Sequence, residues 1–234
     1  MADLTQRDIT RLYNMFSSSI TNVDCGEKCG VYNANHVPFC CDIRCVIPSV
    51  YPCEWEYLKY NTDLWRPLEK NDRYEETFNK LPENQVPLIC LGYQKCQRNF
   101  RSLSCRSFPF FPYIDHHGLF IGLSYYWEYQ DRCWIINHLF SVTTQFRDEF
   151  VAAFQYILER SAQEYDIFYH QSIIMRRVFG RMKRAIPLIS REPTQELIFY
   201  KVSPRTGRMR RADGNNFGKY GYYYFAEKLP FPDE

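Results

Sequence analysis

The sequence predicts an α+β protein in which an irregular, cysteine-rich region with a β-hairpin packs against a C-terminal helical part. Apolar residues recur at helical spacing over residues 144–184, and they alternate as in paired strands over residues 108–129. The ten cysteines fall mostly in stretches that have neither pattern. A chain of 234 residues is long enough to bury one core, and we expect a single domain over residues 1–234.

The N-terminal part alternates short helices with irregular segments. Residues 5–20 carry apolar side chains on one helical face, and this spacing predicts the first helix. Residues 24–52 and 82–105 contain turn residues and cysteines with few periodic apolar positions, which predicts irregular backbone. Two short helices are expected between these segments, at residues 53–61 and 72–81.

The centre of the chain has the pattern of a β-hairpin. Residues 108–114 and 119–129 alternate as two strands, and residues 115–118 form the turn that joins them. His116 and His117 fall in this turn, where we expect their side chains to be solvated.

The C-terminal part, residues 140–234, has the strongest helical pattern. Residues 144–160 and 161–184 each carry an apolar stripe at helical spacing, and Pro187 ends the run. The sequence predicts a strand at residues 197–202, followed by a turn that leads to a partner strand. The aromatic tail, residues 220–225, is expected to pack back onto the rest of the protein.

Composition excludes several classes of protein. Hydrophobic residues make up 45% of the chain and charged residues 24%, values that exclude a disordered chain. No apolar run approaches the roughly 18 residues of a membrane span. The first residues lack the features of a secretion signal. We therefore expect a cytoplasmic protein with no membrane span, whose thiols stay reduced.

Positive charge is concentrated toward the C-terminal end. Residues 170–219 contain twelve Lys or Arg and three Asp or Glu, whereas the whole chain carries a formal net charge of +2. This pattern predicts a solvated face or a docking surface for an acidic protein partner. Nucleic acid is a less favoured partner, because no recognised nucleic-acid-binding motif accompanies the charge.

The cysteines are the main indication of chemistry. Thiols in irregular backbone favour metal coordination, because bonds to a metal order a loop that has little core of its own. Cys25 and Cys29 are spaced to lie on one side of a helical turn. Cys40 and Cys41 are neighbours whose side chains are expected to point apart. They would therefore bind two different metals, or one would be a ligand and the other would have a supporting role.

Short signatures of other sites are absent from the sequence. It has no Cys-x-x-Cys pair, which argues against zinc ribbons and thioredoxin-like sites, and no ferredoxin spacing. Tyr32 stands where a radical S-adenosylmethionine enzyme would need a third cysteine after Cys25 and Cys29. Glycine-rich nucleotide loops and the common hydrolase motifs are also missing, so whether the protein is an enzyme stays open.

Three cysteine-containing elements stand out together. They are Cys25-x-x-x-Cys29-Gly30, Phe39-Cys40-Cys41, and Cys90-x5-Cys96-x8-Cys105-Arg106-Ser107-Phe108-Pro109. This combination resembles the YkgJ-type cysteine-cluster family, whose members are described as zinc- or iron-chelating and are related to flagellin lysine N-methylases. The resemblance covers residues 25–135. It departs from the family pattern in the ten residues that separate Cys29 from Cys40.

The resemblance implies a metal-binding protein with a structural or electron-transfer role. It implies an iron–sulfur cluster, such as [4Fe–4S], or zinc as the cofactor, in two four-ligand sites or in one cluster with ligands left for zinc. The alternative that it implies is a protein-modifying enzyme similar to the lysine N-methylases. The implied metal ligands are Cys25, Cys29, Cys40, Cys41, Cys90, Cys96, Cys105 and Cys133.

Four further residues near these ligands have alternative interpretations. Cys45 and Cys53 are extra to the family pattern, and we do not expect them to be ligands. His36 is interpreted as a loop histidine in preference to a ligand or a donor to one. Arg106 either offsets thiolate charge or is an exposed arginine, and the sequence favours neither.

Overall fold

The computed structural model describes residues 4–82 and 84–214, and its mixture of helices and strands confirms the predicted α+β class. The α-helices are α1 (Gln6–Met15), α2 (Cys25–Gly30), α3 (Pro52–Asn61), α4 (Glu75–Lys80), α5 (Leu103–Ser107), α6 (Thr144–Arg160) and α7 (Ala162–Arg181). The strands are β1 (Ser49–Val50), β2 (Trp65–Pro67), β3 (Val86–Cys90), β4 (Phe110–Ile114), β5 (Phe120–Tyr125), β6 (Ile186–Ser190), β7 (Phe199–Val202) and β8 (Met209–Ala212).

The larger sheet has five antiparallel strands in the order β4-β5-β6-β7-β8. β4 and β5 form the predicted hairpin, with Phe110 opposite Tyr125. β6 then pairs with β5, so the sheet continues from the cysteine-rich region into the C-terminal part. The C-terminal part therefore supplies three strands as well as two helices; the sequence predicts β7 and its partner β8, and it does not predict β6.

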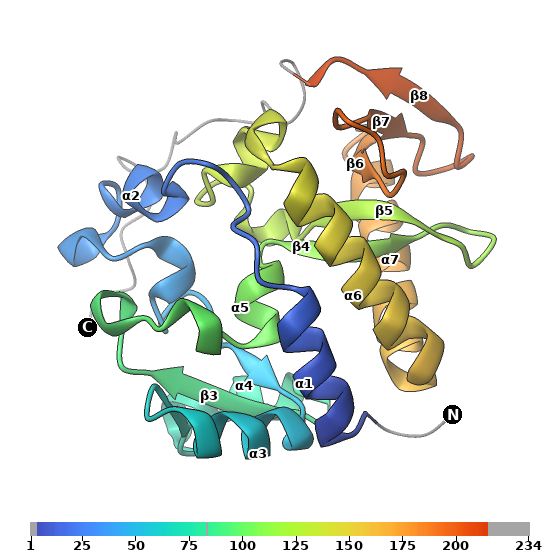
Figure 1. Cartoon of the computed structure of the whole chain (residues 1–234). Coiled ribbons are helices and arrows are strands. Elements are labelled where there is room, and N and C mark those ends of the chain that lie inside the picture. Colours follow the sequence, from blue (N-terminus) through green and yellow to red (C-terminus); the bar gives the residue numbers. More distant parts are fainter. Residues whose placement is uncertain (1–3, 83, 215–234) are drawn as a thin grey trace.

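Two long helices cover the two faces of this sheet. Figure 1 shows α6 in front of the strands and α7 behind them. Successive residues of β4 face the two helices alternately, as the period of a strand requires. Phe110 packs against Phe146 of α6, with ring centroids 5.7 Å apart, whereas Phe111 belongs to a separate buried cluster with Phe179 of α7.

A smaller sheet of three short strands, in the order β1-β3-β2, lies in the cysteine-rich region. Helix α1 connects this region with α6. Its Tyr13 hydroxyl donates to Glu54 of α3 at 2.8 Å, and its Phe16 ring lies 5.5 Å from Phe146 of α6. One buried core therefore takes residues from both regions.

Several predicted boundaries shift. The predicted irregular stretch at residues 82–105 contains β3 and the start of α5, and the second hairpin strand ends at Tyr125, before a 3₁₀ turn at Trp127–Tyr129. The predicted packing of the tail at residues 220–225 lies outside the described residues. Among the described helices, none has the length and hydrophobicity that a membrane crossing needs.

Candidate metal centre

The first predicted ligands lie on helix α2 and on the 3₁₀ turn Phe39–Cys41. Asp24 starts α2, because its carboxylate accepts the Gly26 N–H at 2.8 Å, and this cap places Cys25 in the first helical turn. Cys29 follows on the next turn and is buried. Its sulfur accepts the backbone N–H of Phe39 at 3.4 Å, which brings the two cysteine-bearing segments together.

The neighbouring cysteines 40 and 41 do not point apart as we expected. Their Sγ atoms lie 4.0 Å apart. The reason is the 3₁₀ turn, in which successive side chains differ by about a third of a turn and not by the half turn of a strand. The hydrogen bond between the two thiols raises the pKa of Cys40 and lowers that of Cys41.

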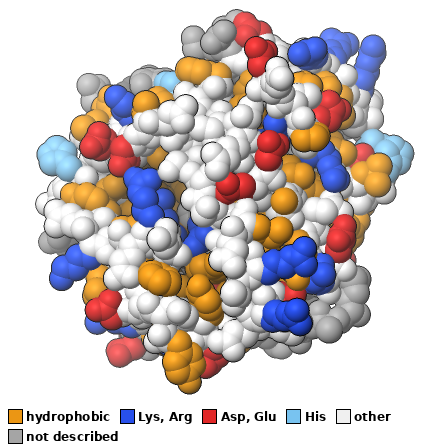
Figure 2. Space-filling view, in the orientation of Figure 1, with side chains coloured by type: hydrophobic (Ala, Val, Ile, Leu, Met, Phe, Trp, Pro, Cys, Tyr) orange, Lys and Arg blue, Asp and Glu red, His pale blue; other side chains and the backbone are white. Residues whose placement is uncertain are grey.

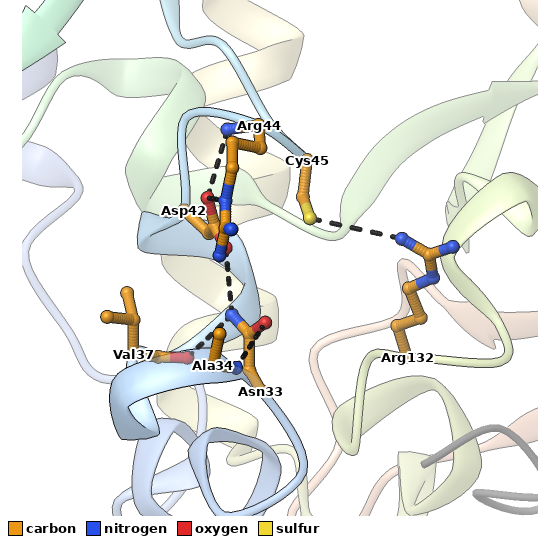
Figure 3. A network of polar contacts seen from close by, with 7 residues as sticks. All are labelled: Asn33, Ala34, Val37, Asp42, Arg44, Cys45 and Arg132. Atoms are coloured by element: carbon orange, nitrogen blue, oxygen red, sulfur yellow. Dashed lines mark hydrogen bonds and ion pairs between the residues drawn. The ribbon is translucent and has the colours of Figure 1, made fainter. Parts of the chain in front are cut away.

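A polar network fixes the loop on either side of this turn (Figure 3). The buried Asp42 carboxylate accepts a hydrogen bond from Asn33 Nδ2 at 3.1 Å, and it forms an ion pair with Arg44 at 2.7 Å. Asn33 Nδ2 also donates to the carbonyl of Val37 at 2.9 Å. The loop is therefore held by side chains that are not themselves thiols.

The later cysteines lie around the end of β3 and the start of α5. The backbone N–H of Gly92 bonds to Cys90, and φ of +98° at Gly92 is a conformation that favours glycine. The Arg101 guanidinium donates from Nε to Cys96 Sγ at 3.2 Å. Burial raises the pKa of Cys105 to about 12, even though the Ser102 hydroxyl bonds to this thiol and lowers it.

Electrostatic contacts group four thiols into a first thiol set. Burial and then the charges of Cys25 and Cys29 raise the pKa of Cys133. The same two charges add to the raised pKa of Cys40, whose largest cause is the bond to Cys41. Such effects need short separations, because a Coulomb interaction weakens with distance. The first thiol set is Cys25, Cys29, Cys40 and Cys133.

The other four predicted ligands form a second thiol set. Burial and then the charges of Cys41 and Cys96 raise the pKa of Cys90, despite its bond to Gly92. The charges of Cys41 and Cys90 add to the effect of burial at Cys105. The two sets meet at the Cys40–Cys41 pair. The charge of Cys41 also adds to the effect of burial in raising the pKa of Cys29 in the first set. The second thiol set is Cys41, Cys90, Cys96 and Cys105.

The two cysteines that the sequence analysis left out have different surroundings. Burial and then the charge of Asp42 raise the pKa of Cys45, whose Sγ lies 3.9 Å from Arg132 (Figure 3). Burial and then the charge of Glu54 raise the pKa of Cys53 to about 11. In neither case does a leading contribution come from another cysteine.

The cation beside the thiols is Arg101, which sequence reasoning missed. Burial alone would lower its pKa, but the bond to Cys96 and the charges of Cys96 and Cys105 raise it. Arg106 takes neither of its two expected roles, because it is buried and donates to backbone carbonyls, among them Asn99 at 2.6 Å. His36 is exposed, as expected of a loop histidine.

Within residues 4–82 and 84–214, no three His, Cys, Asp or Glu side chains are arranged closely enough to hold a metal ion. The thiol sets are thus neighbourhoods of sulfur, and metal coordination would draw their atoms closer. The chain matches no protein-family model, no curated protein and no solved structure. The family resemblance, the choice between zinc and iron, and the alternative enzyme activity therefore stay predictions.

Proposed function

We propose that the protein binds metal through its two thiol sets, as zinc or as iron–sulfur clusters, and that the metal orders the cysteine-rich region. The grouping of the cysteines carries this proposal. Eight thiols from separate segments of the chain lie in one electrostatic network, whereas Cys45 and Cys53 have other surroundings.

Hydrogen-bond donors directed at sulfur support the proposal. A neutral thiol is a weak acceptor and gains little from a donor, whereas a thiolate gains much more. Backbone N–H groups bond to Cys29, Cys90 and Cys133, and the Arg101 guanidinium bonds to Cys96. Donors of this kind orient metal ligands and tune the metal that they hold.

The donor set fits both metals. Four thiolates are the ligands of structural zinc sites and also of [4Fe–4S] clusters. Zinc supplies a crosslink between chain segments, and a cluster also carries an electron. Four thiolates on Zn²⁺ leave about two negative charges. The guanidinium of Arg101 offsets part of this charge in the second thiol set.

Elemental analysis of anaerobically purified variants tests the proposal. Cys133→Ser removes a ligand of the first thiol set and Cys96→Ser one of the second. We expect each variant to lose about half of the bound zinc or iron, and the double variant to lose nearly all. Cys53→Ser is the matched control and should keep its metal.

Visible absorption then distinguishes the metals, because only an iron–sulfur centre gives a band that dithionite bleaches. A wild-type protein that binds neither metal would contradict the proposal. Equal metal loss in Cys53→Ser and Cys96→Ser would contradict the assignment of ligands.

A further inference from the structure

Three arginines surround a cavity between helix α1 and the end of helix α6. Its volume is about 350 Å³, and Arg7, Asp8, Arg11, Tyr156 and Arg160 line it. Figure 2 shows Lys and Arg side chains gathered at the lower right of this face, where Figure 1 places α1 and the end of α6. None of these residues belongs to the thiol sets.

The tyrosine and the aspartate hold two of the three arginines in place. The guanidinium carbons of Arg11 and Arg160 lie 4.6 Å and 3.5 Å from the centre of the Tyr156 ring. Asp8 accepts the Tyr156 hydroxyl at 2.6 Å, and the same carboxylate oxygen lies 3.6 Å from Arg160 Nε. Side chains with fixed positions lose less entropy when a ligand binds.

Both oxygens of Asp8, the single carboxylate that lines the cavity, already accept hydrogen bonds. The second oxygen accepts the backbone N–H of Thr5 at 2.9 Å and the Thr5 hydroxyl at 2.6 Å, as part of the capping box of α1. Burial would raise the pKa of Asp8, but the hydrogen bonds from Thr5 and Tyr156 lower it. Asp8 is therefore ionised at neutral pH and engaged on both oxygens.

Positive charge remains in excess around the cavity. Arg7 and Arg11 are one turn apart on α1, and like charges at this spacing repel each other. Within the described part of the chain, no carboxylate pairs with either of them. Three guanidinium groups against one carboxylate leave an excess of two positive charges.

We propose that this cavity binds the phosphate group of a small phosphorylated metabolite. The forked N–H donors of arginine match phosphate oxygens. A phosphate monoester carries close to two negative charges at neutral pH, which equals the excess. The volume lies near the lower end of the range for small-molecule sites, so it has room for a phosphate and a few further atoms.

Isothermal titration of the purified full chain tests the proposal, with glycerol 3-phosphate and inorganic phosphate as probes. We expect saturable binding of both, with the monoester the tighter. Arg11→Gln should weaken the binding of glycerol 3-phosphate at least tenfold, because one charge-assisted contact is lost. Arg11 is exposed, so the variant should fold, and its melting temperature checks this. Arg205→Gln, at an exposed site away from the cavity, is the matched control.

Three outcomes would overturn the proposal. One is the absence of saturable binding at millimolar phosphate. Another is an equal loss of affinity in Arg205→Gln, which would indicate general charge attraction. The third is tighter binding of inorganic phosphate than of the monoester, which would indicate a simple anion site. All three are independent of the metal content of the protein.

Discussion

The cysteine-rich region and the five-stranded sheet differ in what holds them together. The sheet lies between α6 and α7, and its core contains fully buried rings such as Phe146 and Phe150. The cysteine-bearing segments have short helices, with six residues in α2 and five in α5, joined by 3₁₀ turns. Helices of this length are far too short to be stable alone.

This difference indicates where a metal would matter. Apolar packing is enough to stabilise the sheet and its two helices. The segments around the thiols add residues such as Leu103 to the shared core, and they are also held by capping residues, the Asp42 network and hydrogen bonds to sulfur. On our proposal, metal supplies the stability that packing does not supply there.

Removal of the metal should have the largest effect, and the effect should be regional. A chelator such as EDTA, with a reductant, should lower the free energy of unfolding by several kcal/mol, because metal binding is coupled to folding in such sites. Hydrogen exchange measured by mass spectrometry should rise most in residues 24–45 and 90–105. Residues of α6 and of β4 to β6 should stay protected. A uniform rise along the chain would contradict the distinction between the two regions.

Phe150→Ala tests the other region. The ring is fully buried among Phe16, Phe146 and Phe154, so its removal leaves a cavity. We expect a loss of about 3–5 kcal/mol in chemical denaturation, with unchanged metal per folded molecule. Phe140→Ala, at a ring that is 44% exposed, is the control and should cost far less. Metal loss in the folded Phe150→Ala protein would show that the regions are not separable.

Glu54 links α3 to α1 and α5, and it gives a pH test. Burial raises its pKa to about 7, although the Leu103 N–H and the Tyr13 hydroxyl bond to the carboxylate. Because the folded protein holds this proton more tightly than the unfolded chain, Glu54 contributes stability below about pH 4.5 and loses it as pH rises through about 7.

Glu54→Gln should remove this pH dependence. Its stability relative to wild type should rise by about 1–3 kcal/mol between pH 5 and pH 8, as measured by urea denaturation. Glu56→Gln, on the exposed face of the same helix, is the control. A difference between wild type and Glu54→Gln that is the same at both pH values would contradict the buried, protonated carboxyl.

The smallest expected effect is that of Arg101→Gln. Loss of the guanidinium that donates to Cys96 should lower metal affinity about tenfold, as for other groups that support metal ligands. Competition with a chromogenic chelator measures this. Lys95→Gln removes an exposed charge from the same loop and should leave the affinity unchanged. Equal effects of the two variants would mean that general charge, and not the bond to sulfur, is responsible.

Sequence reasoning works best where a pattern repeats. The apolar stripe predicts α6 with the bounds Thr144–Arg160, and alternation predicts the β4–β5 hairpin. β6 is missed because all of its residues are buried and show no alternation. In the sequence, Pro187 indicates only the end of the preceding helix. The family resemblance, and not spacing alone, selects the eight cysteines, and their role as ligands stays a prediction.

Details of the site depend on contacts that spacing does not encode. The mutual approach of Cys40 and Cys41 depends on the 3₁₀ geometry of Phe39–Cys41. Arg101 and Arg106 are both arginines near Cys105, and their roles differ because only one of them faces sulfur in the fold. One sequence carries no signal that distinguishes them.

X-ray absorption spectroscopy of the anaerobically purified protein, at the zinc and iron edges, tests the central claim most directly. Our account predicts a bound metal whose nearest neighbours are all sulfur, with four sulfurs per zinc at about 2.3 Å, or the sulfur and iron shells of a cluster. A metal with mainly nitrogen or oxygen neighbours, or no bound metal at either edge, would contradict it.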